Sequence, residues 1–223
     1  MGQVIGEILP LALGVAISPI PIIAAILMLL SPRAKSLSLG FLLGWLLGIV
    51  VASVVFTLIG SLITVADGDA SQPIAGVVKI VLGALLLVLA LGQWRKRPKE
   101  GETAALPKWM AAIDSMKPGA AFGLAFLLAA VNPKNLMMAA AAGVAIGTSS
   151  IAIGGEIVAV VVFVVIAVCS VAIPVIAYLV AADRMRAPLE RLRVWLAANN
   201  ATVMAILLLV IGVVTVGKGI GSF

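Results

Sequence analysis

The sequence predicts an all-α membrane protein with six transmembrane helices, arranged as two inverted three-helix repeats. The first observation is composition: 63% of the residues are hydrophobic, 11% are charged and the mean hydropathy is +1.27. The second is the presence of apolar runs of 18 or more residues, which indicate membrane-spanning helices. The third is that the first and fourth of these runs are both broken by prolines. Matched breaks in two halves are typical of secondary transporters.

The six predicted helices cover most of the chain. Several exceed the ~20 residues needed to cross a bilayer, which indicates tilt, kinks or unwound centres. We expect residues 1–94 to form the first repeat, 95–117 a basic linker and 118–223 the second repeat. Little chain remains for a soluble domain. The predicted helices are residues 4–30, 37–65, 74–94, 118–147, 151–182 and 197–217.

The basic residues predict the orientation of the chain. Connections one, three and five contain twelve of the 15 Lys and Arg residues, whereas connections two and four contain none. Basic connections stay on the cytoplasmic side, so both termini are expected outside a bacterial cytoplasmic membrane. The net charge of +6 is then a feature of membrane orientation, and no nucleic-acid partner is predicted. These residues are Arg33, Lys35, Arg95, Lys96, Arg97, Lys99, Lys108, Lys117, Arg184, Arg186, Arg191 and Arg193.

This orientation makes helices 1–3 and 4–6 two units that cross the membrane in opposite senses. Weak internal similarity supports such an inverted repeat. Each unit opens with a proline-broken helix and closes with an aliphatic helix that contains glycine, residues 81–86 in the first unit and 210–214 in the second.

The two proline breaks form the candidate substrate or ion site. Proline removes a backbone N–H, and the residue before it leaves helical geometry. A Ser or Asn followed by Pro is a good start for a helix, so each motif predicts the start of a second half-helix. Such starts carry partial positive charge, and two of them meeting at mid-membrane could bind an anion or carboxylate. The alternative is a pair of structural kinks. The candidate residues are Ser18, Pro19, Pro21, Asn132, Pro133, Lys134 and Asn135.

Lys134 is the most informative single residue. It lies about 16 residues into its segment, which is near mid-membrane at the ~1.5 Å rise of a helix. A lysine there costs ~2.5–3.5 kcal/mol on insertion scales and is by default functional. We expect it to contact substrate or a coupling ion. The alternative is a lysine that bonds only to the carbonyls freed by Pro19 and Pro21.

Three further charged residues, Glu7, Lys79 and Glu156, are predicted near the outer ends of helices one, three and five. Lys79 can extend its ammonium to the interface and form a structural ion pair with Glu7 or Glu156. The alternative is that these residues form an outer gate or proton relay.

Helix two carries Gly40, Gly44 and Gly48 at four-residue spacing. Such a small face allows close helix packing, either within the bundle or across a homodimer.

No enzyme constellation is present in the sequence. There is no histidine and only one cysteine, Cys169, which is expected to act as a small apolar filler. Walker motifs and CxxC pairs are also absent. We therefore expect a non-enzyme without metal or cofactor.

Several motifs resemble those of a known superfamily. Ser18-Pro19-Ile20-Pro21 is similar to the small-Pro-x-Pro motif in helix one of the lysine-exporter (LysE) superfamily, and Asn132-Pro133-Lys134 to its Asn-Pro-Lys in helix four. The whole chain most resembles the actinobacterial GAP/Sap family of glycolipid- and sulfolipid-addressing proteins. The supporting segments are Leu11-Ala12-Leu13-Gly14-Val15-Ala16-Ile17-Ser18-Pro19, Gly40-Phe41-Leu42-Leu43-Gly44-Trp45 and Leu91-Gly92-Gln93-Trp94-Arg95-Lys96-Arg97-Pro98.

The resemblance implies an exporter or translocation factor that moves an envelope glycolipid outward with the help of other envelope machinery. Elsewhere in the superfamily the cargo is an amino acid or a cation, so an amino-acid or small-solute exporter is the first alternative. A scaffold for envelope-lipid enzymes that does not itself transport is the second. The related DsbD/CcdA-type electron carriers place cysteines beside comparable prolines, and those positions hold no cysteine here. Without an acid at the centre to pair with an ammonium group, a lipid or anionic cargo is favoured.

Overall fold

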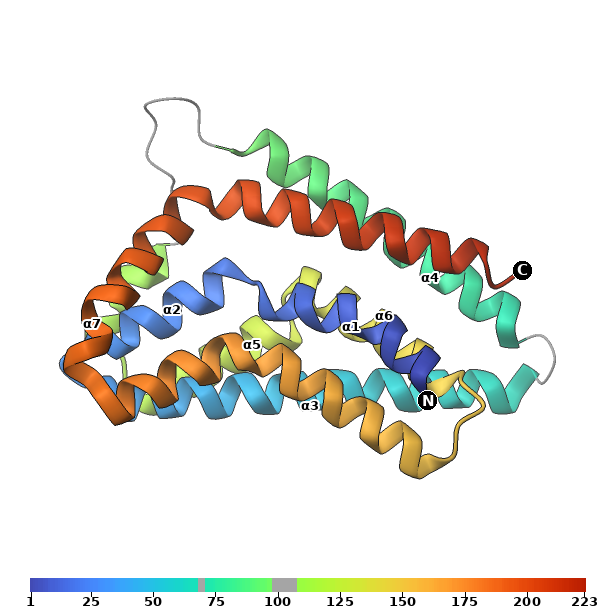
Figure 1. The fold of residues 1–223 in the computed structure, drawn as a ribbon, viewed down its shortest axis with the longest axis horizontal. Helices are drawn as coiled ribbons and strands as arrows, with labels where there is room; N and C mark the ends of the chain where they lie inside the picture. The colour runs from blue at the N-terminus through green and yellow to red at the C-terminus, as the bar shows by residue number, and fades with distance from the viewer. Residues whose placement is uncertain (68–70, 98–107) are drawn as a thin grey trace.

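A computed structural model describes residues 1–67, 71–97 and 108–223, and within these ranges the chain is helical without strands. The all-α prediction is therefore confirmed. Most of the predicted linker, residues 98–107, lies outside the described residues. Figure 1 shows the helices, which are α1 (Gly2–Ala16), α2 (Pro19–Leu30), α3 (Ala34–Asp67), α4 (Ser71–Arg95), the 3-10 helix η2 (Lys108–Ser115), α5 (Pro118–Ala130), α6 (Pro133–Gly147) and α7 (Ile153–Ile220).

The first and fourth predicted helices are each broken at their prolines, as expected. α1 and α2 meet at an angle of 49°, and α5 and α6 at an angle of 58°. The cause is local, because Ser18 (φ −97°, ψ 106°) and Asn132 (φ −60°, ψ 121°) have extended backbone just before a proline. Pro19 and Pro133 then occupy the first positions of α2 and α6, where a missing N–H costs nothing.

α7 differs from the prediction. The sequence analysis expects two helices, 151–182 and 197–217, whereas the structure has 68 continuous helical residues. Residues 183–196 are rich in Arg, Leu and Ala, which are good helix formers, so the predicted loop is itself helical. Ala181 has non-helical backbone (φ −144°, ψ 57°). Figure 1 shows that α7 turns and runs back toward the end from which it started.

By length and composition, three helices can cross a membrane, and up to five segments can if each bent pair forms one span. α3, α4 and α7 are the three. α7 counts once in this total although it contains both of the last two predicted segments. The chain is thus a membrane protein, and the six-span inverted repeat stays a prediction.

The bundle has two distinct ends. Figure 1 shows both chain termini at one end, and the α2–α3 connection together with the turn of α7 at the other. We call these the terminal end and the basic end, because connections one, three and five contain the basic residues. Much of the surface between the ends is apolar, and Leu62, Val165 and Ile173 are each more than 60% exposed. Such a surface suits contact with lipid tails.

Glycines bring α3 against α5. A Cβ added at Gly44 would lie 2.1 Å from the carbonyl oxygen of Phe122, and one added at Gly40 would lie 2.7 Å from that of Pro118. Gly48 makes a similar approach to Phe126. The predicted glycine face therefore packs within the bundle. A homodimer is not tested by this packing.

A second close crossing joins α4 to α7. A Cβ at Gly83 would lie 2.9 Å from the carbonyl oxygen of Gly212, and a Cβ at Gly212 would lie 3.1 Å from that of Gly83. These are the glycines that the sequence analysis aligns between the two predicted repeats. The corresponding closing helices of the two halves are thus in direct contact.

Candidate functional site

The two proline breaks meet in the interior of the bundle. Ser18, Lys134 and Asn135 are 4%, 4% and 2% exposed, although 116 residues separate Ser18 from Lys134. Pro19 and Pro21 are also buried, in the first turn of α2, whereas Pro133 is exposed. The structure therefore brings most of the predicted site residues together.

Lys134 bonds to the end of α1. Its ammonium donates to the carbonyl oxygen of Gly14 at 2.6 Å and to the hydroxyl of Ser18. In an uninterrupted helix, the N–H of Ser18 would reach the Gly14 carbonyl, but the backbone of Ser18 is extended. The lysine thus supplies a donor at the negative end of α1. The carbonyl it uses precedes those that Pro19 and Pro21 free.

Ser18 and Asn135 extend the contact from Lys134. The Ser18 hydroxyl can donate to Asn135 Oδ1 at 3.3 Å, and Asn135 Nδ2 donates to the carbonyl oxygen of Leu128 near the end of α5 at 2.9 Å. Asn132 caps α6 as expected, because its side chain accepts from the Lys134 N–H at 3.1 Å. Ser18 precedes α2 without a side-chain capping bond, since its hydroxyl is taken by the other break.

The charge of Lys134 has no counter-charge within the described residues. The ion pairs there join Lys79 to Glu7 and Arg193 to Glu190. An ammonium has three donors, and the contacts with Gly14 and Ser18 account for two of them. A buried charge is costly unless an opposite charge or polar groups offset it. The start of α6 adds further positive potential, so the site can attract an anion.

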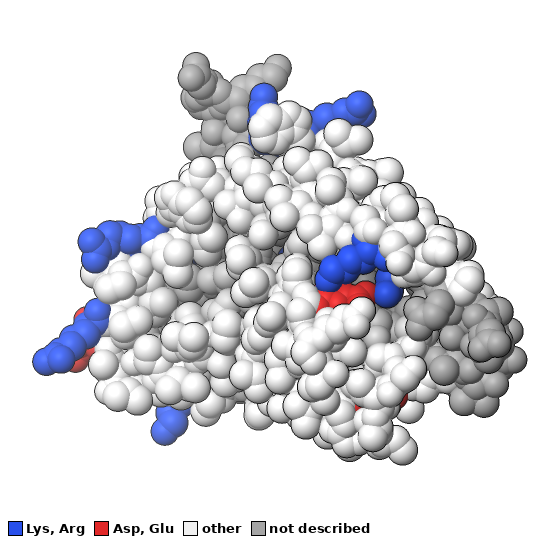
Figure 2. All heavy atoms as spheres, turned by 45° about the vertical axis from the view of Figure 1, so that its right-hand side comes forward, with Lys and Arg blue, Asp and Glu red and all other residues white. Residues whose placement is uncertain are grey.

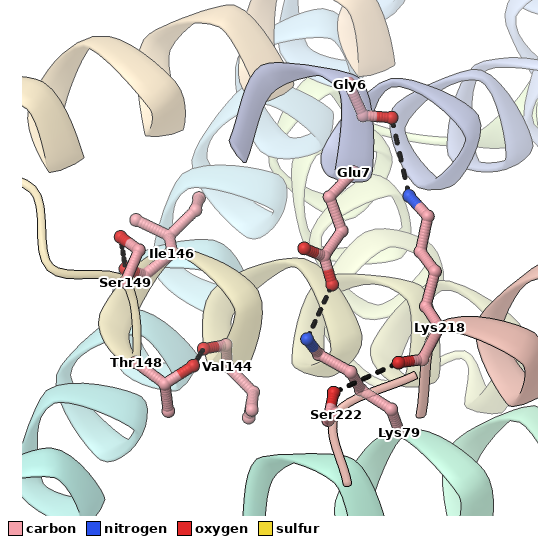
Figure 3. A network of polar contacts seen from close by, with 9 residues as sticks. All are labelled: Gly6, Glu7, Lys79, Val144, Ile146, Thr148, Ser149, Lys218 and Ser222. Atoms are coloured by element: carbon pink, nitrogen blue, oxygen red, sulfur yellow. Dashed lines mark hydrogen bonds and ion pairs between the residues drawn. The ribbon is translucent and has the colours of Figure 1, made fainter. Parts of the chain in front are cut away.

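A second charged cluster lies at the terminal end. Lys79 on α4 forms an ion pair with Glu7 on α1 at 2.7 Å, while Lys218 on α7 donates to the Gly6 carbonyl oxygen at 3.4 Å (Figure 3). Figure 2 shows acidic and basic side chains side by side on an otherwise largely uncharged face. The choice left open between Glu7 and Glu156 falls to Glu7, and Glu156, half-buried on α7, forms no ion pair among the described residues.

Sequence reasoning missed Lys218. A signal was present, because only Lys79, Lys134 and Lys218 of the 15 basic residues lie outside the basic connections. All three side chains belong to the two polar clusters described above.

A cavity of about 780 Å³, here called the terminal cavity, opens beside this cluster. A narrower space of about 10 Å³, enough for about one water, lies beside Leu11, Ala141 and Thr215 and also touches Glu7. Glu7, Leu11, Gly14 and Ser18 share one face of α1, since they are spaced at three or four residues. The terminal cavity is lined by Met1, Gln3, Val4, Gly6, Glu7, Lys79, Ala145, Thr148, Ser149, Ser150, Ile151, Lys218, Gly221 and Ser222.

Comparison with known families gives one assignment. Residues 8–221 match the family model described as "Sap, sulfolipid-1-addressing protein". The matched range includes both proline breaks and confirms the resemblance to the GAP/Sap family. The wider LysE superfamily is not tested by this match and stays a prediction. Comparison with curated proteins and with solved structures found no match.

Proposed function

We propose, since the chain belongs to the Sap (sulfolipid-1-addressing protein) family, that it is a secondary transporter for an anionic envelope glycolipid. In this proposal it moves the lipid outward across the bacterial cytoplasmic membrane. The family description and the apolar helices support a role in handling envelope lipids. The direction and the substrate class are our inference.

The observation that carries this proposal is the buried ammonium of Lys134 at the junction of the two breaks. It is held by neutral oxygens of Gly14 and Ser18 and has no carboxylate partner in the described part of the chain. A sulfate or phosphate group that reached it would supply the missing negative charge. The side chain is 4% exposed, so the described conformation is closed and the headgroup would be admitted when the breaks separate.

The face of α1 offers a path from this site to the terminal cavity. Glu7 and Gly14 are seven residues apart, about 10 Å along a helix, and Leu11 lies between them. In the proposed cycle, an anionic headgroup that leaves Lys134 is attracted next by Lys79 and Lys218. The Glu7–Lys79 ion pair, at 2.7 Å, would act as the outer gate because an arriving anion competes with Glu7 for the Lys79 ammonium. Glu156 has no part in this gate.

Six spans and an inverted repeat remain part of the proposal. Three observations support them: the reversal of α7 (Figure 1), the meeting of the two breaks, and the contact between Gly83 and Gly212. Inverted repeats place the substrate at their interface near mid-membrane, where Ser18 and Lys134 lie in contact.

A scaffold that does not transport is the second candidate, because the Lys134 contacts also have a structural reading. Its ammonium completes the end of α1 and Asn135 completes the end of α5. In that case the charge at residue 134 would matter for stability alone. An amino-acid exporter is less well supported, since it needs a carboxylate for the substrate ammonium and none is paired with the central site in the described residues.

The test is complementation of a deletion strain, with lipids extracted from the surface of intact cells. The variants are Lys134→Met, which keeps length without charge, and Lys134→Arg, which keeps charge. The control is Lys117→Met, which removes an exposed lysine outside the site. All are compared at equal membrane abundance and with unfolding temperatures measured in detergent.

We expect Lys134→Met to leave the surface glycolipid at the level of the deletion strain, while Lys117→Met restores it fully and Lys134→Arg restores it partly. Full restoration by Lys134→Met would instead support the scaffold. Unchanged lipids with an amino acid accumulating inside the cells would support the small-solute exporter.

A further inference from the structure

A second large cavity lies at the basic end, far from the terminal cavity along the bundle. Its volume is about 680 Å³, within the ~300–1,000 Å³ typical of ligand sites. The α2–α3 connection forms one wall, and α7 next to the non-helical Ala181 forms the other. We call it the basic cavity, and it is lined by Ser31, Pro32, Arg33, Ala34, Lys35, Ser36, Leu39, Tyr178, Leu179, Ala182 and Arg186.

The charge of this cavity has one sign. Arg33 and Lys35 come from the start of α3 and Arg186 from α7, and no acidic residue contributes to the wall. None of the three forms an ion pair within the described residues. The Ser31 and Ser36 hydroxyls donate to the Met28 and Arg33 carbonyl oxygens. The cations are therefore the donors left for a ligand, and guanidinium groups match the oxygens of sulfate and phosphate.

The rest of the wall is apolar. Leu39, Tyr178 and Leu179 line the cavity, and the surface of α7 beside it exposes Ile176 and Val180 by 56% and 83%. A free inorganic anion has no use for such a surface. A lipid does, because its chains can follow the apolar side of α7 while its headgroup stays among the cations at the membrane surface.

We propose that the basic cavity binds the headgroup of an anionic lipid, with Arg33 and Arg186 holding its sulfate or phosphate group from opposite walls. The cavity is separate from Lys134 and would receive the lipid before it reaches the central site. The inference rests on the proposed function only for its physiological cargo. Binding itself can be measured without transport, so either proposal can fail while the other stands.

The experiment is isothermal titration of the full chain, purified in the uncharged detergent dodecyl maltoside. The probes are dihexanoyl phosphatidic acid, dihexanoyl phosphatidylcholine and sodium sulfate. The test variant is Arg33→Gln/Arg186→Gln. The matched control, Arg184→Gln/Arg191→Gln, removes two exposed arginines from α7 that do not line the cavity. Unfolding temperatures are measured for each protein.

We expect phosphatidic acid to bind more tightly than phosphatidylcholine or sulfate. The test variant should weaken its binding about tenfold or more, since each basic residue contributes to anionic-lipid affinity, and the control should weaken it less than about twofold. Equal losses in the two variants would show attraction to surface charge in general and overturn the site. Equally tight sulfate binding would overturn the lipid in favour of a free anion.

Discussion

The ammonium nitrogen of Lys134 lies 2.6 Å from the carbonyl oxygen of Gly14, across 120 residues of sequence. The break in the first half of the chain is thus completed by a side chain that follows the break in the second half. Any movement that separates α1 from α6 must break this contact. The same bond therefore stabilises the closed conformation and marks the place where opening would begin.

The Ser18 hydroxyl is expected to stabilise the junction, because it accepts from Lys134 and can donate to Asn135. Ser18→Ala removes both contacts and leaves buried polar groups short of a partner, so it should lower the free energy of unfolding by about 1–3 kcal/mol. Unfolding in detergent measures this change. Ser115→Ala, at an exposed position, is the control and should stay within about 0.5 kcal/mol of the wild type. Equal stability of the two variants would contradict the junction.

Asn132 is expected to hold the start of α6 through its bond to the Lys134 N–H. Asn132→Ala should cost about 0.5–2 kcal/mol, and Asn132→Ser, which keeps a capping oxygen, should cost less. Hydrogen exchange at the first turn of α6 measures the effect locally. No difference between the two substitutions would mean that the capping bond is absent in the membrane.

The Glu7–Lys79 pair is expected to be strongly coupled, because its two side chains are only 18% and 10% exposed. A double-mutant cycle with Glu7→Gln and Lys79→Met should give a coupling energy of about 0.5–3 kcal/mol. The comparison pair, Glu190 and Arg193, has side chains 45% and 25% exposed. The same cycle there, with Glu190→Gln and Arg193→Met, should give at most about 1 kcal/mol. Equal coupling in the two cycles would argue against a buried pair.

Gly44 is expected to be essential for packing, because a Cβ there would lie 2.1 Å from a backbone oxygen of α5. Gly44→Ala forces two helices apart and should destabilise the protein by about 1–3 kcal/mol. Gly92 is also inside a helix but has open space around it. Gly92→Ala should therefore be neutral or stabilising by up to about 1 kcal/mol. The difference between their unfolding temperatures is the measurement, and equal values would rule out the close crossing.

The orientation is open to cysteine labelling in a Cys169→Ala background. Ser150→Cys, exposed at the terminal end, should react with a membrane-impermeant maleimide added to intact cells. Ser115→Cys, exposed just before α5, should react only after the cells are opened. The reverse pattern would invert the predicted orientation, and labelling of both from outside would mean that the number of spans between them is not even.

The sequence by itself determined the properties that depend on neighbouring residues. Apolar length marked the helices, and Ser18-Pro19 and Asn132-Pro133 marked the breaks, because proline acts on the backbone next to it. The absence of a helix break near Ala181 was harder to predict, since the charged residues after it favour helix as much as loop.

Only the tertiary structure decided which distant groups meet. It gave Lys134 the Gly14 carbonyl, chose Glu7 over Glu156 as the partner of Lys79, and brought Lys218 to the same cluster. Such choices depend on how helices pack, and close packing depends on where side chains are missing, as at Gly83 and Gly212. Many pairings satisfy the same hydropathy pattern, whereas a packed bundle of given shape permits one.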